Sequence, residues 1–215
     1  QYYAQAVQQQ ISEKGVAGSQ FFVFQALNEL RQIATIPEGL TEGRVESAKL
    51  DLLTEQLLDA LANGHKALVF VNFLAAIESI SARLDAAGVG FVTMSGATRD
   101  RQTLVNRFQN DPDCRVFVMT LKTGGVGLNL TAADTIFIYD PWWNVAAENQ
   151  AIDRAHRIGQ QNKVLAYKLI AQDSIEEKIL QLQQIKKELF DNIISADGAS
   201  LKALSEDDIK LLLGK

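Results

Sequence analysis

The sequence predicts an α/β fold in which a mainly parallel sheet carries helices on both of its faces. Ala67–Val71 (ALVFV) is a short, continuous apolar run, as expected for a strand that is buried on both faces. Runs of this kind alternate with segments of helical periodicity as far as Ile170. Glycine or Asp-Pro breaks separate several of these segments. Alternating strands and helices form βαβ units, whose crossovers are right-handed.

Two helices are expected before this region, and a third leads into the first strand. Gln1–Ile11 is polar and favours a helix. Gly15 and Gly18 are expected to end it, and Ser19 to cap the next helix, Phe21–Thr35. The third helix carries one apolar stripe, made of Leu50, Leu53, Leu57 and Leu61.

The remaining elements follow in a regular order. They are helix Leu74–Ala87, strand Gly90–Met94, helix Arg99–Gln109, strands Arg115–Thr120 and Thr135–Tyr139, a helix within Trp142–Gln160, and strand Val164–Ile170. Ser174 and Glu177 have the spacing of a capping box, which predicts the start of a long helix. Its apolar side consists of Ile175, Ile179, Leu182, Ile185 and Leu189. After a break at Gly198, a final short helix is expected from about Ser205.

Composition narrows the classes of function. The net charge of −5 and the pI of about 5.1 argue against a generally basic nucleic-acid binder, although a local basic groove stays open. A single cysteine, Cys114, excludes an internal disulfide framework and a cysteine-based zinc cluster. His65 and His156 lack metal-ligand spacing. No export signal or bilayer-length apolar run is visible, so we expect a cytoplasmic, nucleoid-associated protein. The start at Gln1, within a helical pattern, predicts a piece of a longer protein.

The segment Trp142–Gln160 carries the most specific pattern. Gln150, Arg154 and Arg157 are spaced i, i+4 and i+7, which places them on one face of a helix. Such a face suits a polyanion, because guanidinium groups bind phosphate bidentately and stay charged. The alternative is a solvated helix face with pairs such as Asp153 with Arg157.

Two further stretches have both a structural and a functional interpretation. Thr120–Leu130 (TLKTGGVGLNL) is glycine-rich and follows a strand, where α/β sheets bind ligands. It lacks the P-loop and dinucleotide patterns, and a tight turn without a ligand would explain it equally well. Tyr139–Asn144 (YDPWWN) places two tryptophans on a loop. They either pack under neighbouring loops or contact a nucleic acid.

In this order and spacing, GGVGLNL, YDPWWN and QAIDRAHRIGQ closely resemble the second RecA-like lobe of SWI/SNF-family ATPases, of bacterial or archaeal type. These are superfamily-two, helicase-like translocases that move on double-stranded DNA. The resemblance covers about Gly43 to Ser195. It implies a helical lead-in at residues 1–42, a RecA-like helicase lobe at 43–172 and C-terminal brace helices at 173–215.

The resemblance implies an ATP site that this lobe completes. Arg154 and Arg157 match the arginines of the family's QxxxRxxR helix, and Arg157 matches the principal arginine finger. Gln150 matches the glutamine that helps couple nucleotide state to lobe closure. Gly125 and Gly127 match loop positions near the nucleotide sugar and phosphates. ATP and Mg²⁺ would be held mainly by the first lobe, so this chain alone is expected to hydrolyse no measurable ATP.

On the DNA side, the family grips phosphates with loops at strand ends. Asn72, Gly96, Thr120 and Lys122 stand at the matching places, and Trp143 matches the tryptophan that approaches the DNA groove. Backbone N–H groups, short polar side chains and a lysine suit phosphate contacts that do not depend on sequence.

Two positions depart from the family pattern, and two rival functions stay open. Many relatives have a smaller or polar residue at Trp142, and a Ser or Thr at Val71. The implied partners are double-stranded DNA, the N-terminal RecA-like lobe of the same parent chain and a DNA-bound protein complex, with no membrane. The rivals are a lobe of a strand-separating superfamily-two helicase and a non-catalytic nucleic-acid-binding module.

Overall fold

The computed structural model describes residues 2–41, 45–124, 128–141, 145–157, 159–185 and 205–213. In these residues a five-stranded sheet has the order β2-β3-β1-β4-β5, and all neighbouring strands pair in parallel. The strands are β1 (Ala67–Val71), β2 (Gly90–Met94), β3 (Cys114–Thr120), β4 (Thr135–Ile138) and β5 (Leu165–Lys168). The predicted α/β class with a parallel sheet is confirmed.

The central strand β1 shows why the apolar run has no alternation. All five of its residues are 0% exposed, because β3 and β4 flank it and helices cover both faces. A strand in this position must be apolar on both sides. The edge strand β5 differs, since its residues are exposed.

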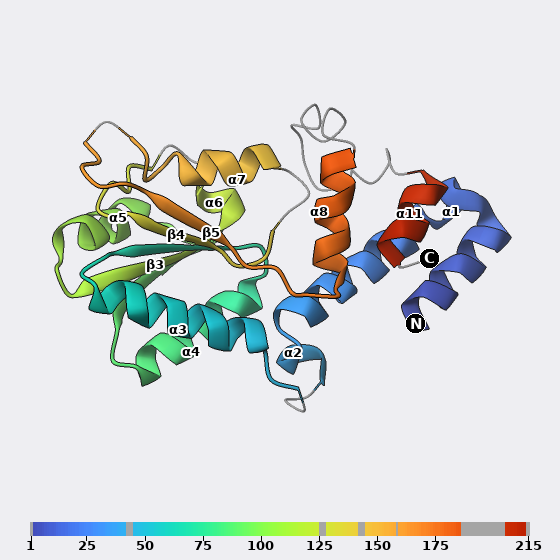
Figure 1. Cartoon of the computed structure of the whole chain (residues 1–215), viewed down its shortest axis with the longest axis horizontal. Coiled ribbons are helices and arrows are strands. Elements are labelled where there is room, and N and C mark those ends of the chain that lie inside the picture. The colour runs from blue at the N-terminus through green and yellow to red at the C-terminus, as the bar shows by residue number, and fades with distance from the viewer. Residues whose placement is uncertain are drawn as a thin grey trace.

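Helices cover the two faces of the sheet (Figure 1). α3 (Ala48–Ala62) and α4 (Leu74–Ala86) pack against the side chains of Val69, Val71, Val116 and Val118. α5 (Arg101–Asn110), α6 (Leu121–Gly124) and α7 (Val145–Ile152) pack against those of Leu68, Phe70, Phe117 and Met119. Successive side chains of β1 and β3 therefore lie in the hydrophobic cores on opposite faces of the sheet, as expected for a pleated strand.

A separate small core joins the two ends of the chain. It lies among α1 (Tyr2–Thr35), α8 (Ile175–Ile185) and α11 (Glu206–Leu213), which group beside the sheet in Figure 1. Its buried residues are Val23, Ala26, Leu27, Ile175, Ile179, Leu182, Ile209 and Leu212. The short helix α2 (Glu38–Thr41) then leads from α1 towards α3. We call α1, α8 and α11 the helical bundle.

The first predicted helix break is only partly correct. α1 is continuous from Tyr2 to Thr35 except at Gly15, whose φ of 71° and ψ of 171° kink it. Gly18 does not end the helix. Ser19 does not cap a new one either, because its Oγ donates to Gly15 O at 2.8 Å, one turn back. This buried hydroxyl keeps the helical path after the kink.

At the starts of α5 and α8, local hydrogen bonds differ from those predicted. α5 begins at Arg101, and not at Arg99, because the Asp100 carboxylate accepts from Thr103 N and caps the helix. At α8, Ser174 Oγ accepts from Glu176 N at 3.1 Å, while Glu177 accepts from Asp173 N at 2.9 Å. The predicted reciprocal capping box is therefore wrong in detail, because each bond is shifted by one residue.

Two predicted strand lengths and one apolar stripe also differ from the structure. β4 ends at Ile138, and β5 spans Leu165–Lys168 within the predicted Val164–Ile170. Ile185 is 70% exposed although it was expected on the apolar side of its helix. Leu189 and Gly198 lie outside the described residues.

Adjacent leucines on α3 test this packing. Leu53 is fully buried and Leu52 is 45% exposed. Leu53→Ala should lower the free energy of unfolding by about 2–5 kcal/mol, because it leaves a cavity in the core. Leu52→Ala should lower it by less than about 1 kcal/mol. Urea unfolding followed by circular dichroism measures both, and equal losses would contradict the assigned packing of α3.

Candidate functional site

Parallel pairing brings four of the predicted phosphate contacts to one edge of the sheet. Asn72 follows β1, Gly96 follows β2, Thr120 ends β3 and Lys122 lies in α6 directly after it. Val71 is in register with Thr120, so β1 and β3 end at the same level. Gly125, Gly127 and Trp143, also predicted from the sequence, lie outside the described residues.

The four residues differ in how exposed they are. Gly96 and Lys122 are exposed and Asn72 is half-buried. Thr120 is 9% exposed, and its hydroxyl lies 2.6 Å from that of the buried Thr123. Sequence reasoning missed Thr123. Its signal was the spacing of two threonines across the strand–helix junction. Gly96 and Lys122 are therefore the more accessible members of this set.

The segment after α7 does not continue as a helix. Asp153 N still bonds to Asn149 O, but Arg154 N bonds to Ala151 O and Ala155 N to Ile152 O, three residues back. The α-helix ends at Ile152 and the chain tightens into turns of the 3₁₀ type. The prediction that one helix face carries Gln150, Arg154 and Arg157 is therefore wrong for the two arginines, which follow the helix end.

Gln160 holds the segment that follows α7. Its Nε2 donates to Thr131 O at 3.1 Å, Ala133 O at 2.7 Å and Ala155 O at 3.2 Å. Gly159, with φ of 107°, reverses the chain so that this amide reaches back. Gln160 was part of the sequence motif, but nothing in its spacing identified these partners. It fixes the turn that presents the two arginines.

The arginine turn, residues 153–157, is attached to the end of the glycine-rich loop. Leu130 N donates to Arg154 O at 3.2 Å. Ala151 and Ala155 are fully buried beneath it, whereas Gln150 and Arg157 are exposed and Arg154 is half-buried. Arg157 is thus exposed to solvent. A phosphate or other polyanion is the chemistry that it fits.

An ion pair connects α7 to the sheet. Glu148 is 1% exposed on α7 and forms an ion pair with Lys168 of β5. This pair joins the helix that precedes the arginine turn to the edge strand of the sheet.

Several known proteins resemble this chain in sequence and in structure. A family profile described as the helicase conserved C-terminal domain matches residues 48–159, more than half of the chain. The SWI2/SNF2 ATPase C-terminal domain of Sulfolobus solfataricus superposes with a TM-score of 0.75 at 26% identity. The match covers 98% of this chain and 89% of that one. The chain belongs to the helicase C-terminal domain family, as the C-terminal lobe of a SWI/SNF-family ATPase.

Two further comparisons set the context of this lobe. The SWI2/SNF2 ATPase core of the same organism, in complex with double-stranded DNA, gives a TM-score of 0.81 at 28% identity. That match covers 98% of this chain and 46% of the other. The DNA repair protein rad8 of Schizosaccharomyces pombe is 37% identical over 79% of this chain and 15% of its own length. The chain spans less than a fifth of the curated relatives it matches.

A buried ionic cluster is the main feature of the lobe that sequence reasoning missed. Its members are Arg31 of α1, Lys49 of α3, Asp140 after β4 and Glu176 of α8. All four are at most 8% exposed. Their sequence signal was weak, because a charged residue beside an apolar stripe does not reveal its partner.

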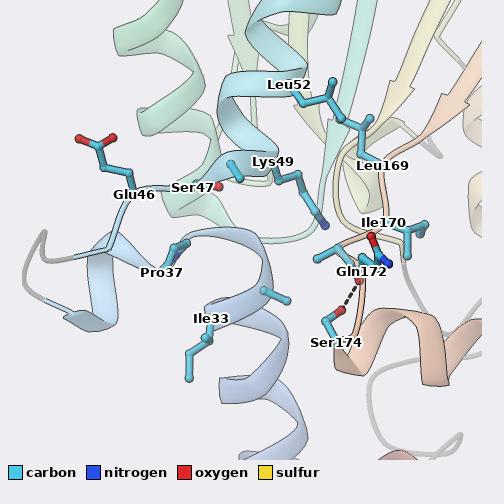
Figure 2. Close-up of a pocket in the computed structure, with 13 residues that line it drawn as sticks. Ile33, Pro37, Glu46, Ser47, Lys49, Leu52, Leu169, Ile170, Gln172 and Ser174 are labelled. Carbon is cyan, nitrogen blue, oxygen red and sulfur yellow. Dashed lines mark hydrogen bonds between the residues drawn. The ribbon is translucent and has the colours of Figure 1, made fainter.

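The cluster lies beside an open cavity of about 460 Å³. Figure 2 shows Lys49 reaching from α3 towards the segment that leads into α8. Burial raises the pKa of Asp140 to about 7, against the opposing effect of Arg31. Burial also lowers the pKa of both Arg31 and Lys49, and neighbouring carboxylates oppose this. Opposite charges within the cluster therefore offset part of the desolvation of Arg31, Lys49 and Asp140.

In the described part of the chain, no helix is long and apolar enough to cross a bilayer.

Neighbouring glutamines test the arginine turn. Gln160→Ala removes the three bonds to carbonyl oxygens and should lower the free energy of unfolding by about 1–3 kcal/mol. Gln161 is exposed, so Gln161→Ala should change it by less than about 0.5 kcal/mol. Denaturant unfolding compares the two, and indistinguishable midpoints would show that Gln160 does not hold the turn.

Proposed function

We propose that this lobe is the second motor half of an ATP-dependent translocase or remodeller that moves on double-stranded DNA. It would supply arginine fingers to ATP bound by the first lobe and contacts to the DNA backbone. Closing and opening of the two lobes would then move one DNA grip relative to the other.

One observation carries this proposal: residues of the two candidate surfaces are linked by one short stretch of chain, residues 120–130. Thr120 and Lys122 stand at the start of the segment 120–130, at the carboxyl edge of the sheet. Leu130, at its end, donates to Arg154 O in the arginine turn. A change in the position of the arginines therefore has a short covalent and hydrogen-bonded path to the phosphate-contacting edge.

The arginine turn supports the ATP side of the proposal. Arg157 is exposed, Arg154 is half-buried and Gln150 is exposed one turn earlier. A guanidinium that reaches the γ-phosphate of ATP would offset the charge that develops there during transfer. Such a finger is worth roughly 10³–10⁵ in rate. Mg²⁺ and most of the nucleotide contacts would come from the first lobe.

The strand ends support the DNA side. Gly96 is exposed on a turn in which Thr98 Oγ1 accepts from Ser95 N at 2.9 Å, and Lys122 is exposed at the next strand end. A glycine backbone and a lysine can both approach phosphates without reading bases. The similar Sulfolobus core was solved in complex with double-stranded DNA, which supports this choice of duplex.

The net charge of −5 does not conflict with a local phosphate-binding edge. Acidic side chains gather elsewhere, since Glu206, Asp207 and Asp208 open α11 in the helical bundle. The lobe can therefore be acidic as a whole and still present Lys122 and exposed backbone to DNA.

Arginine variants test the proposal in a protein that joins this lobe to its first lobe. Arg157→Ala should reduce DNA-stimulated ATP turnover by about 10³-fold or more, because it removes the proposed finger. DNA affinity should stay near normal. Arg83→Ala is the matched control, because Arg83 lies on α4 and pairs with Asp51 at 2.8 Å.

Steady-state ATPase rates and fluorescence anisotropy on a DNA duplex give the two readouts. Normal turnover in Arg157→Ala would remove this residue from the finger role. Equal losses in Arg157→Ala and Arg83→Ala would point to a general defect and contradict the assignment.

A further inference from the structure

The ionic cluster connects the helical bundle to two of the strand ends through Arg31. Arg31 is 2% exposed on α1. Its Nη2 donates to Pro141 O at 3.2 Å, and its guanidinium lies 5.0 Å from the centre of the Phe73 ring. Phe73 follows β1 and Pro141 follows β4. One side chain of the bundle therefore contacts both segments.

The same two segments are bonded to each other. Both carboxylate oxygens of Asp140 accept from Asn72 N, at 2.7 and 3.0 Å. Asn72 Nδ2 in turn donates to Asp140 O. We call Asn72–Phe73 and Asp140–Pro141 the strand-end pair. It contains Asn72, one of the proposed DNA contacts.

Lys49 and Glu176 make a second connection, to Tyr139 directly after β4. Lys49 Nζ donates to Tyr139 O at 3.2 Å and to Glu176 Oε1 at 2.6 Å. Glu176 lies in the first turn of α8 and also accepts from Ala171 N at 2.8 Å. On α1, Thr35 O accepts from the Tyr139 hydroxyl at 2.9 Å. α1 is thus bonded directly to Tyr139, which precedes Asp140, and α8 is connected to Tyr139 through Lys49 of α3.

Stability alone is a weak reason for such a cluster. Burying charges carries a desolvation penalty, and well-packed apolar residues often stabilise a core as much or more. Charged groups add directional hydrogen bonds. A hydrogen bond to a particular carbonyl oxygen fixes the relative position of two segments more closely than apolar contacts do. The cluster therefore fits a positioning role.

We propose that Arg31 is a positioning residue. It holds the strand-end pair and thereby transmits the placement of the helical bundle to the DNA-facing edge. The DNA part of this inference rests on the proposed function. The positioning part does not, since it concerns bonds within this chain.

Hydrogen exchange at the Asn72 amide tests the positioning part directly, because this amide is bonded to Asp140. Arg31→Met should accelerate its exchange by about tenfold or more, since the pair loses a charge-assisted restraint. The Val69 amide in the core of β1 should keep its protection. Gln32→Met, one residue along α1, is the control and should leave both amides unchanged.

Arg31→Lys keeps the charge but loses the planar fork, so it should give an intermediate acceleration. It also carries the test if Arg31→Met does not fold. Unchanged exchange at Asn72 in a folded Arg31 variant would overturn the positioning role. Equal acceleration at Asn72 and Val69 would overturn it too, because it would report general destabilisation.

DNA binding by the two-lobe protein separates this inference from the proposed function. In an Arg31 variant that accelerates exchange at the Asn72 amide, the affinity for a DNA duplex should fall about tenfold. This loss is equivalent to one charge-assisted hydrogen bond. Faster exchange with unchanged DNA affinity would establish that Arg31 positions the pair, while overturning its link to DNA. The proposed ATPase role would then be judged separately, by the Arg157 variant.

Discussion

The parallel pairing of the strands is the constraint on which the rest of this lobe depends. Because β1, β2, β3 and β4 run in the same direction, the segments that follow them emerge at a single edge. Only a few residues separate each of these strands from the next helix. Short polar stretches separated along the chain thus become neighbours, whereas an antiparallel sheet would divide them between two edges.

Two parts of the lobe are connected to this edge: the arginine turn and the helical bundle. Thr120 and Lys122 lie at this edge, and Leu130 N donates to Arg154 O in the arginine turn that follows α7. The helical bundle reaches this edge through Arg31 of α1, and through Glu176 of α8, which is bonded to Lys49 of α3. The proposed function requires the arginine turn and the proposed DNA contacts to move together. Buried, directional hydrogen bonds on both sides favour such rigidity.

The sequence predicted the fold well because the signals were local. Apolar runs such as Ala67–Val71 and the leucine stripe on α3 require no knowledge of partners. The resemblance to SWI/SNF-family ATPases placed Asn72, Gly96, Thr120 and Lys122 at strand ends, where the structure has them. The failures came from long-range bonds. Gln160 donates to carbonyls 27 and 29 residues earlier in the chain, and Arg31 donates to Pro141 O across 110 residues. Periodicity contains no information on such pairs.

The orientation of the lobe on DNA is the central claim, and cysteine protection measures it most directly. The native Cys114 is buried, so a cysteine placed on the surface reports separately from it. Single cysteines at Gly96, on the carboxyl edge, and at Gln161, exposed before β5 at the opposite edge, would be alkylated in the two-lobe protein with and without a DNA duplex. Mass spectrometry of the labelled peptides gives the rate at each position. DNA is predicted to slow alkylation at residue 96 and to leave residue 161 unaffected. Protection at residue 161 alone, or equal protection at both, would contradict the account.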